Sequence, residues 1–201
     1  MDEPEHQRAT RVAYDTVADE YEELLRHHLD DNPHDRAVLG LFADLVLAGG
    51  GGAVVDVGCG PGRITAPLHR LGLEISGIDL SPEMVTVARR THPHLAFSVG
   101  SMGALDLGDR SVSGIVAWYS LIHTPPADRP ATYRELARVL EPGGHLDQAY
   151  GHEIDADVYR LSPDEVSDLL DRAGFEVTTR LVRAPEGIEK QPQAYLLARR
   201  R

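Results

Sequence analysis

The segment best suited to chemistry is the run from Asp56 to Gly62, Asp-Val-Gly-Cys-Gly-Pro-Gly. Its glycines at alternate positions allow the backbone to turn sharply and to approach a ligand that a Cβ atom would keep away. The run does not match a dinucleotide motif, because Arg63 stands where the third glycine is needed. It does not match a phosphate-binding P-loop either, because no Gly-Lys-Ser/Thr ends it. The loop therefore predicts a site for a nucleoside without a pyrophosphate.

Two further residues could complete such a site. Asp79 stands at the end of the next predicted strand, where an acid can accept hydrogen bonds from both ribose hydroxyls. His123 follows the fourth predicted strand, at the carboxyl edge where open parallel sheets bind ligands. His123 fits a general base or a substrate contact, and it also fits a histidine packed at the start of a helix.

Alternating strand and helix patterns must position these residues. Hydrophobic spacing before Leu47 indicates two amphipathic helices, separated at Asn32-Pro33, and the run Ala53–Val55 indicates a buried strand. The later predicted elements are helices over Ile64–Leu71, Ser81 to about Thr91, Pro130–Leu140 and Ser162–Gly174, and strands over Leu73–Ile78, Leu95–Val99, Gly114–Tyr119, Phe175–Val182 and Ala194–Ala198. The pattern predicts a doubly wound, mostly parallel, seven-stranded Rossmann-like α/β sheet with an antiparallel C-terminal hairpin.

Composition limits the organisation and the partners. The 201 residues predict one domain, with residues 1–48 as a two-helix lid and residues 53–201 as the sheet. The single cysteine, Cys59, leaves no internal disulfide and fits a reducing compartment, and without a secretory signal or membrane span we expect a cytoplasmic protein. The net charge of −12 disfavours nucleic acid as a partner, and the scattered histidines disfavour a metal site.

The glycine loop, Asp79 and the alternating topology together resemble the class I methyltransferase family, which binds S-adenosylmethionine. The matching segments are Val54–Arg63, Gly77–Met84, Gly100–Met102, Ile115–His123 and Arg138–Gly144. Tyr14-Asp15 and Tyr21 resemble the N-terminal helix that closes over the methionine end of the cofactor in many small-molecule methyltransferases.

This resemblance implies a set of site residues. Asp56 and the glycine backbone would hold the amino acid part of the cofactor, Asp79 its ribose, and Leu80 and Met102 the faces of its adenine. The full set of predicted cofactor-binding residues is Tyr14, Tyr21, Asp56, Gly58, Cys59, Gly60, Asp79, Leu80, Ser101, Met102 and Tyr119, and His123 is the candidate catalytic base. Cys59 also fits a small packing residue, which is the commoner role of a cysteine in a glycine turn.

The sequence departs from the family pattern in two places. Gly100-Ser101 stands where the third strand often ends in an acid, so that adenine contacts would depend more on backbone and on Met102. The run His145–Tyr150 is short and polar where the family usually has a long apolar fifth strand. A truncated fifth strand is therefore expected.

The resemblance implies methyl transfer from S-adenosylmethionine to an O, N or C nucleophile of a small molecule, with S-adenosylhomocysteine as product. A protein of this kind would act as a monomer or homodimer, without a metal. An alternative from another class is a non-methylating protein that retains the fold as a ligand-binding, regulatory or structural scaffold. The acceptor, the methylated atom and the role of His152 are left open by the sequence.

Overall fold

A computed structural model describes residues 3–26, 28–150, 159, 162–186, 189 and 191–201. His152 lies outside the described residues. The helices are α1 (Glu5–Leu25), α2 (His28–Asp31), α3 (Pro33–Ala48), α4 (Thr65–Arg70), α5 (Pro82–Thr91), α6 (Arg129–Val139) and α7 (Pro163–Arg172), with one 3₁₀ turn, η1 (Leu121–His123). The strands are β1 (Ala53–Val57), β2 (Glu74–Asp79), β3 (Phe97–Val99), β4 (Val112–Trp118), β5 (Leu140–Tyr150), β6 (Phe175–Arg183) and β7 (Gln193–Arg200).

The strands form one sheet in the order β3-β2-β1-β4-β5-β7-β6. Strands β1 to β5 pair in parallel, and β7 runs antiparallel to both β5 and β6. This confirms the predicted doubly wound sheet and its antiparallel C-terminal hairpin. The chain order reverses between β1 and β4, and open α/β sheets bind their ligands at the carboxyl ends of the strands beside such a reversal.

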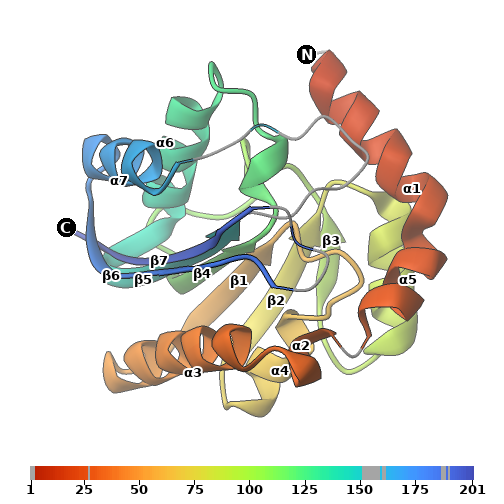
Figure 1. Cartoon of the computed structure of the whole chain (residues 1–201), viewed down its shortest axis with the longest axis horizontal. Coiled ribbons are helices and arrows are strands. Elements are labelled where there is room, and N and C mark those ends of the chain that lie inside the picture. The colour runs from red at the N-terminus through yellow and green to blue at the C-terminus, as the bar shows by residue number, and fades with distance from the viewer. Residues whose placement is uncertain (1–2, 27, 151–158, 160–161, 187–188, 190) are drawn as a thin grey trace.

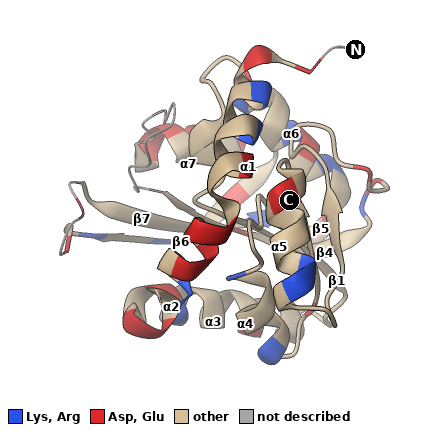
Figure 2. Cartoon of the chain, turned by 90° about the vertical axis from the view of Figure 1, so that its right-hand side faces the viewer, with Lys and Arg blue, Asp and Glu red and all other residues tan. Residues whose placement is uncertain are grey.

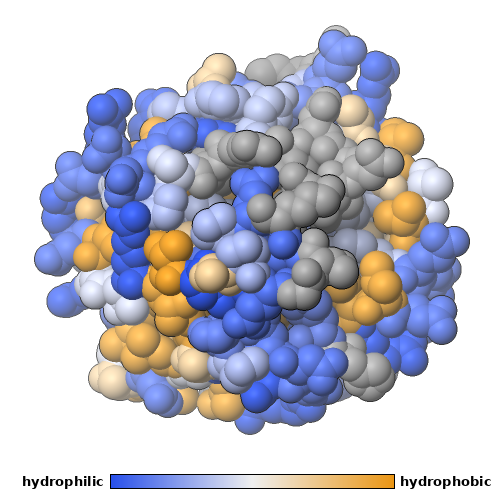
Figure 3. Space-filling model, viewed as in Figure 1, coloured by the Kyte–Doolittle hydropathy of each residue, from blue (hydrophilic) through white to orange (hydrophobic). Residues whose placement is uncertain are grey.

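Helices cover both faces of this sheet (Figure 1). As drawn there, α6 and α7 lie above the sheet, α3 and α4 lie below it, and α1 packs outside α5. The described part of the chain holds no helix long and apolar enough to cross a bilayer. The face in Figure 3 is mainly hydrophilic, with hydrophobic residues gathered in the region of α3, where Leu41 and Leu47 are exposed.

The two predicted N-terminal helices have different positions. Asn32 caps α3 by accepting hydrogen bonds from the backbone N–H groups of His34 and Asp35, which explains the predicted boundary. From there α3 packs against the sheet, where Phe42 and Val46 fill the space left by Gly114. Helix α3 therefore belongs to the layer that covers the sheet, whereas α1 lines the cavity at the edge of the sheet.

The fifth strand is not truncated, which corrects the expectation drawn from its polar residues. Strand β5 is eleven residues long and pairs with β4 on one side and β7 on the other. Gln148 is buried and accepts a hydrogen bond from the Tyr133 hydroxyl at 3.1 Å. Asp147 is fully buried, and burial raises its pKa well above its usual value. A neutral carboxylic acid at this position is compatible with a core strand.

Candidate functional site

A cavity lies at the carboxyl edge of the sheet and encloses about 910 Å³, its open mouth included. Its wall comes from α1, from the glycine loop after β1, from the ends of β2, β3 and β4, and from the segment that leads into α6. Of the predicted site residues, those that line it are Tyr14, Tyr21, Gly58, Gly60, Asp79, Leu80, Ser101, Met102, Tyr119 and His123.

The glycine loop forms an open cradle in this wall. Gly58 and Gly60 have φ angles of +74° and +52°, which L residues rarely adopt. A Cβ atom on Gly58 would stand 2.3 Å from the Cβ of Ser120, so that packing also requires glycine there. A Cβ on Gly60 would meet nothing closer than the Met84 sulfur at 4.0 Å, so the backbone of Gly60 faces open space. A ligand can therefore approach the loop at Gly60.

Asp79 ties the cradle to the next strand. Its Oδ2 accepts a hydrogen bond from the Gly60 N–H at 2.7 Å, and its Oδ1 accepts one from the Ser81 N–H at 2.8 Å. Burial nevertheless raises the pKa of Asp79, because desolvation outweighs these two bonds. A carboxylate has about four lone-pair sites, so each oxygen retains capacity for a hydroxyl donor from the cavity.

Helix α1 is fastened to the start of α5. Ser81 caps α5 by accepting from the Met84 N–H at 3.0 Å, and its hydroxyl donates to Oδ1 of Asp15 on α1 at 2.6 Å. Ala18 of α1 also packs with Met84 and Val87 of α5. Because Ser81 follows Asp79 by two residues, the position of α1 is set directly beside that carboxylate.

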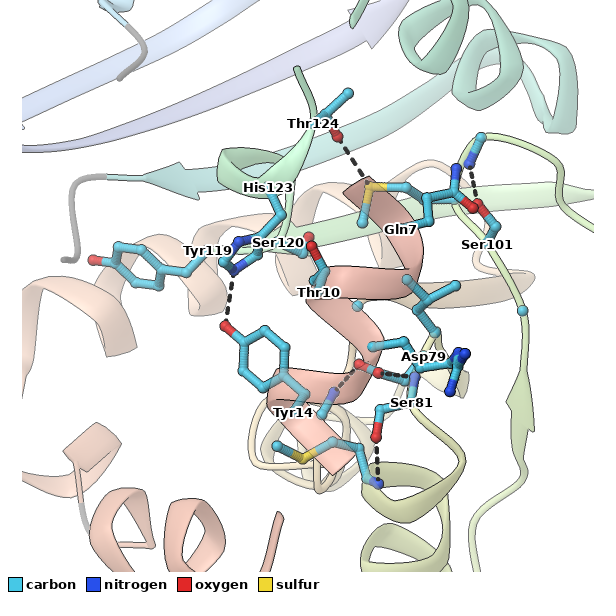
Figure 4. Close-up of a pocket in the computed structure, with 18 of the residues that line it drawn as sticks. Gln7, Thr10, Tyr14, Asp79, Ser81, Ser101, Tyr119, Ser120, His123 and Thr124 are labelled. Atoms are coloured by element: carbon cyan, nitrogen blue, oxygen red, sulfur yellow. Dashed lines mark hydrogen bonds between the residues drawn. The ribbon is translucent and has the colours of Figure 1, made fainter. Parts of the chain in front are cut away.

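Tyr14 on α1 reaches across the cavity to His123 (Figure 4). The Tyr14 Oη lies 2.8 Å from the His123 Nε2, and the two rings meet edge to face. Burial strongly raises the pKa of Tyr14, so its phenol stays protonated. A phenol both donates and accepts, so the tautomer of His123 sets the direction of this bond: Nε2 accepts when the imidazole proton is on Nδ1.

Three predicted residues have side chains that turn away from the cavity. Asp56 accepts from the Thr65 hydroxyl at 2.7 Å, and burial raises its pKa to about 7. The thiol of Cys59 packs in a small apolar cluster with Val85, Ala88 and Phe97, which matches its packing role and leaves only its backbone near a ligand. Tyr119 borders the cavity but points its ring away (Figure 4), and its hydroxyl donates to Gln193 at 3.0 Å.

Sequence reasoning missed several polar residues of the wall. Ser120 has a buried hydroxyl with no hydrogen-bond partner among the described residues, although it lines the cavity. Gln7 and Thr10 enter from α1, Thr124 from the segment before α6, and Thr132 from α6 itself. The only available signal for Gln7 was its spacing, because Gln7, Tyr14 and Tyr21 lie seven residues apart and therefore share one helical face.

These features fit a nucleoside that carries an amino acid tail. Gly60 leaves an open cradle, Asp79 retains acceptor capacity for ribose hydroxyls, and Ser120 offers an unused hydroxyl. The arrangement can hold such a ligand between α1 and the sheet edge, with Tyr14 and His123 facing it.

Sequence comparisons agree with this geometry. A family model for a methyltransferase domain matches residues 54–144. An uncharacterized methyltransferase of Mycobacterium tuberculosis is 33% identical over 106 residues, which cover 51% of this chain and 41% of that protein. A ubiquinone biosynthesis O-methyltransferase of Xanthomonas oryzae pv. oryzae is 37% identical over 103 residues, 48% of this chain and 41% of that protein. The chain thus spans about two fifths of the length of these relatives.

Solved structures share the fold at low identity. Magnesium protoporphyrin IX methyltransferase from Synechocystis PCC 6803 with bound SAM has a TM-score of 0.77 and 19% identity, and the match covers 100% of both chains. The [4+2]-cyclase SpnF has a TM-score of 0.76 and 20% identity, covering 98% of this chain and 96% of that one. One fold therefore includes a methyltransferase and a cyclase among the neighbours of this chain.

Proposed function

We propose that this chain, a member of the class I S-adenosylmethionine-dependent methyltransferase family, transfers a methyl group to a nucleophilic O, N or C atom of a small molecule. The observation that carries the proposal is the meeting of three groups in one cavity: the open glycine cradle, Asp79, and the Tyr14–His123 pair. S-adenosylmethionine, when bound, supplies an electrophilic methyl group, so that the protein has to align a nucleophile and exclude water.

The residues divide between holding the cofactor and handling the acceptor. Gly58 and Gly60 would hold its amino acid part by backbone contacts, and Asp79 its ribose hydroxyls. Leu80 and Met102 would flank the adenine. Tyr14 and Tyr21, whose rings lie edge to face with centroids 5.7 Å apart, would cover the methionine end and keep water out.

The Tyr14–His123 pair supports removal of a proton from a hydroxyl acceptor. With the proton of His123 on Nδ1, Nε2 accepts from Tyr14, so a direct transfer to that nitrogen would require the bond to break. A relay avoids this, because the acceptor proton can pass to the Tyr14 oxygen while the Tyr14 proton moves to Nε2. The acceptor oxygen keeps the electron pair that forms the new bond to carbon, and His123 ends as an imidazolium.

The charge distribution supports a small acceptor rather than nucleic acid. The chain has a net charge of −12, and Figure 2 shows acidic residues on the half of α1 that leads to α2. These acidic side chains and the net negative charge would repel a phosphate backbone. We also propose that the chain acts as one domain in the cytoplasm, as a monomer or homodimer.

The test is turnover with S-adenosylmethionine and pools of small metabolites, followed by mass spectrometry of S-adenosylhomocysteine and of the methylated product. The wild-type protein should release S-adenosylhomocysteine with at least one pool, and the Asp56→Ala, Asp79→Ala double variant should not. Release that is equal in both proteins would refute the proposal, because it would not depend on the cavity.

A second candidate function is favoured by one specific finding, the close fold match to a cyclase. A protein of this kind would bind a ligand in the same cavity without methylating it. It would bind S-adenosylhomocysteine or nothing, and broad acceptor pools would give no release above that of the double variant. That outcome would replace the methyltransferase proposal by that of a non-methylating protein that retains the fold as a scaffold.

A further inference from the structure

One end of the cavity is polar and lies away from the Tyr14–His123 pair. The segment after β3 forms its floor, with Ser101 and Gly103, and Gln7 covers it from α1 (Figure 4). A Cβ atom on Gly103 would stand 4.0 Å from the Gln7 Nε2 and 4.0 Å from the Thr132 Oγ1. The absence of that Cβ leaves the Gln7 amide directly beside the cavity floor.

The spacing of α1 places Gln7 on the same face as Tyr14. Seven residues make about two helical turns, which separates the two Cα atoms by about 10 Å along the helix. Both side chains line the cavity. Asp15, which follows Tyr14, accepts a hydrogen bond from Ser81 and so holds α1 against the start of α5. A single helix therefore lines both ends of the cavity.

The Gln7 amide is a donor and an acceptor without an assigned partner. Within the described residues no hydrogen bond to Gln7 is found, whereas the neighbouring carboxylate of Asp128 faces His6 at 3.7 Å. An adenine edge presents an amino donor next to a ring-nitrogen acceptor, and glutamine can pair with both at once. No other side chain named at this end of the cavity combines those two functions in one planar group.

We propose that Gln7 recognises the adenine of the cofactor by two hydrogen bonds and is the residue that selects adenine over other bases. The proposal rests on the proposed function, because it requires the nucleoside to bind with its ribose at Asp79 and its base at Ser101 and Met102. It assigns to α1 a role in choosing the cofactor, in addition to covering it. Gly100-Ser101 offers no carboxylate to the base, so the N-terminal helix supplies the polar contact instead.

The experiment uses S-adenosylhomocysteine, adenosine and purine riboside, which is adenosine without its 6-amino group. Affinities are measured for the full chain and its variants, by calorimetry for S-adenosylhomocysteine and by NMR titration for the two nucleosides. The wild-type protein should prefer adenosine to purine riboside by at least fivefold, the value of about one hydrogen bond. Gln7→Leu should reduce this preference to less than twofold and weaken S-adenosylhomocysteine binding about tenfold.

Two further variants separate base recognition from damage to the helix. Gln7→Glu keeps an acceptor for the amino group, so it should retain the preference for adenosine while binding both nucleosides more weakly. Arg8→Ala changes the next, exposed residue of α1 and should leave all three affinities within twofold of wild type. Thermal melts of each variant verify that α1 remains folded against α5.

Three results would overturn the proposal. Gln7→Leu could retain the full preference for adenosine, or Asp128→Ala could abolish it, which would assign the amino group to Asp128. The wild-type protein could also bind adenosine and purine riboside equally. A different result, in which the wild-type protein binds neither S-adenosylhomocysteine nor adenosine, would instead refute the proposed function on which the inference rests.

Discussion

The cofactor cradle and the acceptor side of the cavity are built from contacts of very different range. In the cradle, the hydrogen-bonded residues Gly60 and Asp79 are 19 positions apart in the sequence, and Thr65 and Asp56 are 9 positions apart. On the acceptor side, Tyr14 meets His123 over 109 residues. The first region is encoded in a short motif, and the second exists only when α1 docks on the sheet edge. We therefore expect substitutions in the two regions to separate binding from turnover.

The largest expected effect is on turnover. His123→Ala should lower kcat/KM about 100-fold with a hydroxyl acceptor, the usual contribution of a general base. Tyr14→Phe should lower it about tenfold, because the relay to Nε2 is lost while the ring remains. The affinity for S-adenosylhomocysteine should stay within threefold of wild type in both variants, measured by calorimetry. Equal losses in affinity and in kcat/KM would instead assign His123 to cofactor binding or packing.

A smaller effect is expected at the junction between the regions. Asp15→Ala removes the acceptor of the Ser81 hydroxyl, and a hydrogen bond to a charged group contributes about 1.5–3 kcal/mol. The amides of α1 should exchange with solvent about tenfold faster than in wild type, as measured by hydrogen exchange with mass spectrometry. The matched control is Glu20→Ala, an exposed acid on the same helix. Unchanged exchange in Asp15→Ala would show that apolar packing alone holds the lid.

The smallest effect concerns stability in the cradle. Burial raises the pKa of Asp56 from 3.8 to about 7, so the folded protein holds a proton that the unfolded chain releases near pH 4. The stability gained is fully present below pH 4 and is lost as the pH rises through 7. The difference in Tm, Asp56→Asn minus wild type, should therefore be several degrees larger at pH 8 than at pH 5.

The control for this pH dependence is Asp106→Asn, because Asp106 is exposed. Its Tm difference from wild type should not vary over the same range. A Tm difference for Asp56→Asn that is flat between pH 5 and pH 8 would show that Asp56 is ionised in the folded protein.

The cradle was easier to predict from the sequence than the acceptor side, because its contacts are local in the sequence. Buried apolar runs and turn glycines are local, so the pattern of residues alone was enough to locate the strands, the cradle and Asp79. The full length of β5 could not be located in this way, because the Gln148 Oε1 is paired with Tyr133 of α6 and the pKa of Asp147 is raised by burial, and both effects depend on distant segments. The outward direction of the Tyr119 side chain could not be predicted either. Its backbone is left-handed, with φ of +55°, a conformation that the sequence usually indicates by a glycine.

The same distinction applies to the lid. The hydrophobic spacing predicted both N-terminal helices, but it could not tell which one would cover the cavity. That choice depends on Asp15 meeting Ser81, and on Phe42 fitting the space above Gly114. Both are contacts between distant segments, which a pattern within one helix does not contain.

The central claim is that Asp79 and the glycine cradle bind the cofactor of this family, and calorimetry with S-adenosylhomocysteine tests it most directly. We predict measurable binding to the wild-type protein and a loss of at least tenfold in Asp79→Ala, since two charge-assisted hydrogen bonds to the ribose would be removed. Asp168→Ala, on the exposed side of α7, should bind as wild type does. Equal affinity in wild type and Asp79→Ala, or no binding to either, would contradict the account.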